Sequence, residues 1–153
     1  MSSHAIRLTT RAPVPVAVIR RLVPPPDLGR AVQSACGAVW QELRTQGLHG
    51  GRHVAIYLDG RITLEAGVEC DLPFLERAGV CRSTTPGGLI ASVTHLGPYA
   101  TLGRAHEAIH AWARATGHRL PGPRWETYGH WQAAWEADPG AIETEVAYLV
   151  APA

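Results

Sequence analysis

The residues most suited to chemistry lie near the C-terminal end of the sequence, where one carboxylate stands among aromatic side chains. Glu126 belongs to the run Trp-Glu-Thr-Tyr at 125–128, and two further tryptophans follow at Trp131 and Trp135. The face of an aromatic ring attracts a cation by about 0.5–2 kcal/mol. This combination predicts a site for lipophilic cations and dyes, because the rings supply apolar area and tolerate different ligand shapes.

A buried Glu126 needs a partner, because an unpaired carboxylate in an apolar setting is costly. One interpretation is structural: an internal arginine, such as Arg52 or Arg124, would pair with it. The other is functional: a bound cation would take that place. Paired buried carboxylates are common in ordinary proteins, so the residues alone leave both interpretations open.

Signals for other chemistry are weak. His106 and His110 are four residues apart, which suits two zinc ligands on one helix face, but a third ligand is lacking. We expect no metal site and no cofactor, since the sequence holds no phosphate loop, dinucleotide fingerprint or nucleophile elbow. The cysteines are expected to be reduced structural thiols.

Two stretches of the chain, 14–69 and 89–150, run through the same order of signals. Each has an apolar strand candidate, a Leu-Gly-Arg-Ala run that opens a helix, a Gly-x-Arg entry into a second strand, and a closing strand. We predict a duplicated β-α-β-β unit. The fold class is then α+β: a largely antiparallel, curved sheet with two helices on one face, a pseudo-twofold axis and a central ligand groove. Residues 1–153 are expected to form a single domain.

Apolar spacing and turn residues give the expected elements of this unit. Helices are expected from Leu28 to about Thr45 and from Leu102 to Gly117, and Gly79–Gly88 is expected to link the two halves. A hairpin turn is expected at Asp59-Gly60. Strands are expected at 14–19, 53–58, 61–68, 89–96, 125–128 and 144–150.

Alternation along the strand at 53–58 predicts which side chains face the helices. Val54, Ile56 and Leu58 are its more apolar set, so we expect them to pack under the helices. The other set is expected to point the opposite way, toward the groove or solvent. That set is His53, Ala55 and Tyr57.

Aligning the halves through Tyr57 and Tyr128 places Glu126 at the position of Ala55. On this alignment Glu126 and Tyr128 share one face of their strand, beside the pseudo-twofold axis, and Trp125 points the other way. The assignment depends on register, because a slip of one residue would invert every side chain.

Several short motifs of the second half form a series. They are His95-Leu96-Gly97-Pro98-Tyr99, the helix with Trp112, Gly122-Pro123, Trp125-Glu126-Thr127-Tyr128 and Thr144-Glu145-Val146. Together they resemble the GyrI-like, or AraC-type effector-binding, domains, whose pattern is HxGxY, a helix, Gly-Pro, ExY and a final Thr-Glu strand. The resemblance implies a duplicated β-α-β-β fold, Glu126 as counter-charge to a cationic ligand, and Tyr128 as the motif tyrosine.

In many members of that family the domain follows a DNA-binding module and binds multiple drugs. No helix-turn-helix precedes it here, so a stand-alone member is expected. Such members are linked to drug sequestration, to modulation of DNA gyrase and, in one subgroup, to hydrolysis of cyclopropane-bearing DNA alkylators. We favour a binding protein for lipophilic, often cationic compounds, with the hydrolase and the gyrase modulator as alternatives. Candidate site residues are Glu126 and Tyr128, which would also be catalytic in a hydrolase, with Tyr57, Trp125, Trp131, Trp135, His95 and Ala55.

Composition excludes several other classes. Hydrophobic residues make up 46% and charged residues 18%, which is typical of a globular protein. All 14 basic residues are arginines and they are dispersed, so direct nucleic-acid binding is not expected. No membrane span or secretory signal is apparent, which favours a cytoplasmic protein. The expected partner is a small molecule, with DNA gyrase or a regulator as the alternative, and the oligomeric state stays open.

Overall fold

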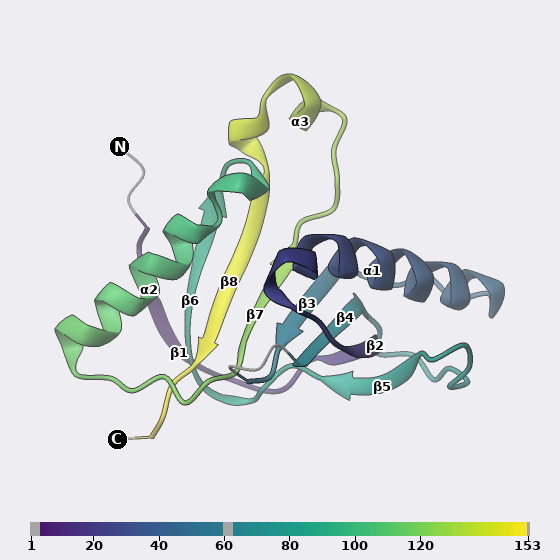
Figure 1. The fold of residues 1–153 in the computed structure, drawn as a ribbon, viewed down its shortest axis with the longest axis horizontal. Coiled ribbons are helices and arrows are strands. Elements are labelled where there is room, and N and C mark those ends of the chain that lie inside the picture. Colours follow the sequence, from purple (N-terminus) through teal and green to yellow (C-terminus); the bar gives the residue numbers. More distant parts are fainter. Residues whose placement is uncertain (1–3, 60–62, 153) are drawn as a thin grey trace.

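The computed structural model describes residues 4–59 and 63–152, which form one eight-stranded antiparallel sheet with two main helices (Figure 1). This confirms the predicted α+β fold class. The first half supplies β1 (Arg7–Arg11), β2 (Pro15–Leu22), the turn η1 (Pro25–Asp27), α1 (Leu28–Thr45), β3 (His53–Tyr57) and β4 (Thr63–Glu69). The second supplies β5 (Cys81–Thr84), β6 (Gly88–Leu96), η2 (Tyr99–Thr101), α2 (Gly103–Thr116), β7 (Arg124–Tyr128), α3 (Ala134–Ala137), η3 (Pro139–Ala141) and β8 (Glu143–Leu149).

The strand order β1-β6-β8-β7-β3-β4-β2-β5 is symmetric about the central pair, β7 and β3. The equivalent strands of the two halves are β2 and β6, β3 and β7, and β4 and β8, with β1 and β5 at the edges. Exchanging each strand with its equivalent gives the same order, read from the other edge of the sheet. In the central pair Ala55 lies directly opposite Glu126, so the pseudo-twofold axis passes between these two residues. A twofold rotation about this axis places Ala55 on Glu126 and Tyr57 on Tyr128, which is the alignment predicted from the sequence.

Two short strands were not expected, and each crosses to the other half. β1 pairs with β6, and β5 pairs with β2. The expectation that Gly79–Gly88 is only a linker was wrong, because this segment contains β5 and the first residue of β6. Of the expected hairpin turn at Asp59-Gly60, Gly60 lies outside the described residues, as do residues 61 and 62 of the following strand.

Both main helices lie against the same face of the sheet, one over each half (Figure 1). α1 buries Val32, Ala35, Cys36, Val39 and Leu43, which recur with helical spacing and pack on β2, β3 and β4. α2 packs on β6 and β8 and ends at Thr116, and the following residue is Gly117, whose positive φ of 74° suits glycine. The cavity described below lies over the central strands, with Tyr57 of β3 and Glu126 of β7 on its wall.

The face assignment for β3 was wrong in one respect. Val54 and Ile56 lie on the sheet face away from the helices, in a separate core with Trp125. Ala55 and Tyr57 pack instead in the core under α1. Hydrophobicity could not distinguish the faces, because both are apolar here: Val54, Ile56 and Ala55 are all fully buried. Helices and groove share one face, so the residues directed at the groove are also those beneath the helices.

Candidate ligand-binding site

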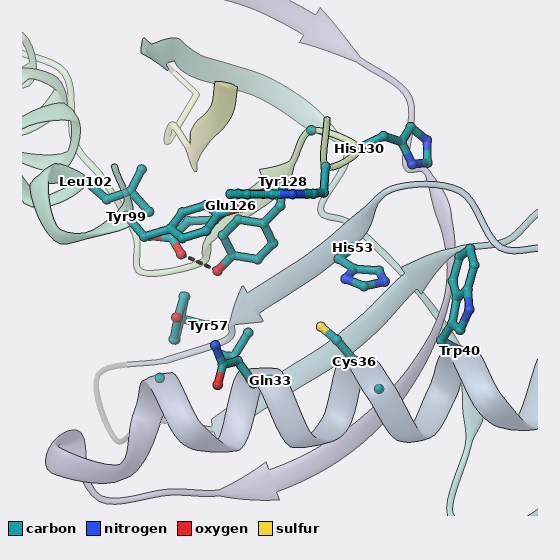
Figure 2. A pocket seen from close by; sticks show the side chains of 15 residues that line it. Gln33, Cys36, Trp40, His53, Tyr57, Tyr99, Leu102, Glu126, Tyr128 and His130 are labelled. Carbon is teal, nitrogen blue, oxygen red and sulfur yellow. Dashed lines mark hydrogen bonds between the residues drawn. The ribbon is translucent and has the colours of Figure 1, made fainter. Parts of the chain in front are cut away.

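A cavity of about 760 Å³ occupies the groove between α1 and the central strands (Figure 2). Its walls come from α1, β3, the η2 turn with Leu102 just before α2, β7 and the loop that follows β7. Figure 2 shows Glu126, Tyr128, Tyr99 and Leu102 on one side of the space and Gln33 and Cys36 of α1 facing them. The lining residues are Gly29, Val32, Gln33, Cys36, Gly37, Trp40, His53, Tyr57, Tyr99, Leu102, Glu126, Tyr128, Gly129, His130 and Trp131.

Two glycines on α1 leave space in the cavity, because they have no side chain. Gly29 and Gly37 lie two helical turns apart and both line the cavity. A Cβ built at either position would meet no heavy atom within 4 Å. A glycine inside a helix costs about 0.5–1 kcal/mol relative to alanine. No close packing requires glycine at these two positions. Their effect is to widen the cavity, because a larger side chain would project into it.

Glu126 is the buried carboxylate of the site, with 8% of its surface exposed. The Tyr128 hydroxyl donates to its Oε1 at 2.6 Å, the contact drawn as a dashed line in Figure 2. Its Oε2 lies 2.6 Å from Nε2 of His106 on α2. The other ring nitrogen, Nδ1, lies 2.6 Å from the hydroxyl oxygen of Tyr148 on β8. A chain of hydrogen bonds thus runs from Tyr148 through His106 and Glu126 to Tyr128.

These contacts keep Glu126 ionised. Burial alone would raise the pKa of its carboxyl group, but hydrogen bonds from His106 and Tyr128, with the nearby charges of His106 and Arg124, outweigh burial and lower it. Burial and the Glu126 charge raise the pKa of the Tyr128 hydroxyl well above its usual value. Burial likewise raises the pKa of Tyr148 to about 12. At neutral pH the site therefore holds one carboxylate and protonated tyrosine donors.

The partner of Glu126 is neither of the arginines considered from the sequence. The Arg124 guanidinium stacks 4.9 Å from the centre of the Tyr57 ring, and Arg52 pairs with Glu69 at 3.0 Å. Among the described residues the hydrogen bonds to Glu126 come from His106 and Tyr128. Sequence reasoning weighed His106 only as a metal ligand, although its alignment with an apolar residue of the first half would have marked it.

Three of the predicted aromatic residues lie on the cavity wall: Tyr57, Tyr128 and Trp131. Trp131 is 54% exposed and sits at the rim, edge-on to Trp135 at 5.5 Å between ring centres. Two further rings were not among the candidates. Trp40 of α1 lines the far end (Figure 2), and Tyr99 packs edge-on to Tyr128 at 5.7 Å.

Four candidate residues do not line this cavity. Trp125 is 3% exposed and points to the opposite sheet face, as alternation with Glu126 requires. Trp135 is buried and only its neighbour Trp131 reaches the rim. Ala55 is fully buried beneath α1.

The fourth of these, His95, lies outside the cavity and packs against the η2 turn, which forms part of the cavity wall. Its Nε2 lies 2.9 Å from the Thr101 hydroxyl oxygen, and its Nδ1 lies 3.1 Å from Nε2 of His4. Gly97 has φ of 148°, and a Cβ there would come within 3.2 Å of both His95 Nε2 and Thr101 Oγ1. This packing fixes the η2 turn, which presents Tyr99 to the cavity. The His-x-Gly-Pro-Tyr motif is therefore a support for the site.

Within the described part of the chain no three His, Cys, Asp or Glu side chains are grouped as a metal site would need. Of the histidine pair on α2, His106 is engaged with Glu126 and Tyr148, and His110 packs edge-on to the Tyr148 ring at 5.1 Å. No helix within residues 4–59 and 63–152 is long and apolar enough to span a membrane.

Several solved structures have a similar fold, and one of them holds a small-molecule cation. The C-terminal domain of EcmrR is 19% identical, with a TM-score of 0.78 over 98% of this chain and 99% of that one. In a complex of EcmrR with DNA, this chain covers only 58% of the longer EcmrR chain. SAV2435, solved with tetraphenylphosphonium bound, is 13% identical, with a TM-score of 0.64 over 96% and 94% of the chains.

A further similar structure is a protein from Listeria innocua described as a hydrolase. It is 13% identical, with a TM-score of 0.60 over 95% of this chain and 91% of that one. No curated protein matches the sequence. The sequence itself matches the GyrI-like small molecule binding domain over residues 4–147, nearly its full length. The chain therefore belongs to the GyrI-like family of small-molecule-binding domains.

Proposed function

We propose that the cavity binds lipophilic small molecules, cations above all, with Glu126 as the counter-charge. The observation that carries this proposal is an ionised carboxylate, largely buried, on the wall of a cavity lined by tyrosine and tryptophan rings. The volume of about 760 Å³ is in the range of pockets that enclose drug-sized ligands. A protein with such a site could hold toxic or signalling compounds away from other targets.

The energetics favour a cation over a neutral compound of the same shape. The cost of burying the carboxylate is already offset in the folded protein by the donors Tyr128 and His106. An arriving monocation then gains the attraction of Glu126 in a setting of reduced dielectric, together with contact with the aromatic rings on the wall, such as Tyr99. The tetraphenylphosphonium held by SAV2435, which has a similar fold, is a ligand of this class.

The test is a titration with methyltriphenylphosphonium, followed by quenching of tryptophan fluorescence, since Trp40 and Trp131 lie on the wall. Replacing Glu126 with glutamine keeps the shape and removes the charge. We expect Glu126→Gln to bind the cation at least about tenfold more weakly, a loss of about 1.4 kcal/mol. Glu69→Gln, which removes a carboxylate outside the cavity, is the matched control. Equal affinity in wild type and Glu126→Gln would remove the role assigned to Glu126.

A hydrolytic activity is the second candidate, and the chain of hydrogen bonds favours it. Glu126 can accept a proton from water, and His106 with Tyr148 behind it can compensate the change in charge. The similar fold described as a hydrolase in Listeria innocua agrees with this possibility. A cyclopropane-bearing DNA alkylator, incubated with the protein and analysed by mass spectrometry, tests it. If no product carrying an added water exceeds the buffer control, hydrolysis of this class of compound is refuted.

A further inference from the structure

The cavity continues well beyond Glu126. The residues of α1 that line it run from Gly29 to Trp40, a length of roughly 16 Å at about 1.5 Å per residue. We call the end formed by Trp40, His53 and His130 the far end. Figure 2 shows these three side chains away from Glu126, toward the other end of the space. A compact ligand held at Glu126 therefore leaves the far end to solvent.

The register of the central strands places His53 at the far end. Ala55 lies directly opposite Glu126, and His53, two residues earlier in β3, lies opposite Tyr128. At about 3.4 Å per residue, His53 is roughly 7 Å from Glu126 along the strands. Its ring packs edge-on to Trp40 of α1, at 5.6 Å between ring centres. The imidazole is thus held between β3 and α1 on the cavity wall.

The ring nitrogens of His53 have no hydrogen-bond partner within residues 4–59 and 63–152. The rings of His95 and His106 differ, because both nitrogens of each are engaged. Burial and the neighbouring His130 lower the pKa of His53, so its imidazole is neutral at neutral pH and offers one donor and one acceptor. Both are therefore open to a ligand group.

The second half of the molecule has no such pair of rings. The twofold rotation places His53 on Arg124, whose guanidinium lies 4.9 Å from the centre of the Tyr57 ring. The Leu-Gly-Arg-Ala runs that open the two helices place Trp40 at the position of Arg114. The repeated fold therefore does not require an indole and an imidazole here, which favours a role in binding for them.

We propose that Trp40 and His53 form a second subsite, which takes a neutral hydrogen-bonding group of the ligand, such as an amide, while Glu126 holds its cationic group. This inference rests on the proposed binding function and deepens it. A primary amide has a donor and an acceptor, which match the acceptor and the donor of a neutral imidazole. The Trp40 ring adds apolar area for the chain that carries the amide. The preferred ligands are then elongated monocations with a polar, uncharged end.

Three phosphonium probes test the subsite, and the first is the compact methyltriphenylphosphonium. The second carries, in place of the methyl group, a chain of five methylene groups that ends in a primary amide. This chain is chosen to cover the roughly 7 Å between Glu126 and His53. The third has the same chain but ends in an isopropenyl group, which has the shape of the amide without its hydrogen bonds. The ratio of the affinities for the amide and isopropenyl probes is measured, so that the contacts of the chain itself cancel.

His53→Phe keeps an aromatic ring and removes the two nitrogens. We expect the ratio to fall about fivefold in this variant, because the amide loses a hydrogen-bond partner that the isopropenyl group never had. The matched control is His49→Phe, since His49 is exposed and lies outside the cavity. It should keep the wild-type ratio. Equal ratios in wild type and His53→Phe overturn the inference.

A measurement on the unmutated protein guards against misfolding of His53→Phe. In nitrogen-15 NMR, saturation with the amide probe should shift at least one ring nitrogen signal of His53, because a hydrogen bond forms there. The isopropenyl probe should shift it much less. Equal shifts with both probes would overturn the inference and leave the binding function standing. Failure of methyltriphenylphosphonium to bind the wild-type protein would instead refute the binding function, and the inference with it.

Discussion

A substitution at Gly37 is expected to change ligand affinity and stability in opposite directions. It lies in the middle of α1, lines the cavity, and a Cβ there would meet no heavy atom within 4 Å. Gly37→Leu should therefore raise the free energy of unfolding by roughly 0.5–1 kcal/mol, since leucine is a far better helix former than glycine. The four added carbon atoms project into the cavity, where they occupy space that a three-ring ligand needs.

We expect Gly37→Leu to bind methyltriphenylphosphonium about tenfold more weakly or worse, a cost of at least about 1.4 kcal/mol. Urea unfolding measures the gain in stability, and fluorescence titration measures the loss in affinity. The matched control is Gly103→Leu, at the start of α2, where a Cβ also has open space but does not face the cavity. Unchanged affinity in Gly37→Leu would show that ligands do not use the α1 wall. A loss of stability would show that the wall is closely packed.

Two further predictions concern the interior. Gly67→Ala should unfold the protein or cost several kcal/mol, because its Cβ would lie 1.9 Å from the Ala17 carbonyl oxygen, and backbone in the sheet cannot yield; a cooperative urea transition like that of wild type would contradict this. Burial raises the pKa of the Cys36 thiol to about 11, so iodoacetamide should label it in the native protein far more slowly at neutral pH than in urea. Equal rates, read by mass spectrometry, would contradict that burial.

The parts of the fold that sequence reasoning predicted are those with a local signal. α1 begins at Leu28 and ends at Thr45 as expected, because apolar spacing and a following glycine mark it. β1 and β5 were missed because their residues, RLTTR and CRST, show no run of apolar residues. Such edge strands are specified by the strand that they join, β6 or β2, and this partner lies far away in the sequence.

The same holds for the site: residues with a local signal could be predicted from the sequence, and the others could not. Glu126 and Tyr128 could be placed on one face because alternation is a local rule, and the repeat fixed their register. His106 escaped notice because its role depends on a tertiary contact, from α2 to Glu126 of β7, that leaves no periodic signal in the sequence. The tryptophans could not be sorted by type alone: Trp125 is in the far core, Trp135 is buried and Trp131 is at the rim. An indole is equally suited to each of these places.

The pairing of Ala55 with Glu126 across the axis explains why the two halves belong in one chain. A homodimer of the second half, with the same sheet, would set two glutamates directly opposite each other on adjacent antiparallel strands. Side chains in that relation have Cβ atoms about 4.5–5.5 Å apart, so like charges there would repel, or one carboxyl would stay protonated. With both halves in one chain this constraint is absent, since the residues at the two equivalent positions can differ. A single carboxylate at the centre, with no second acid opposite it, is thus a property of the asymmetric molecule.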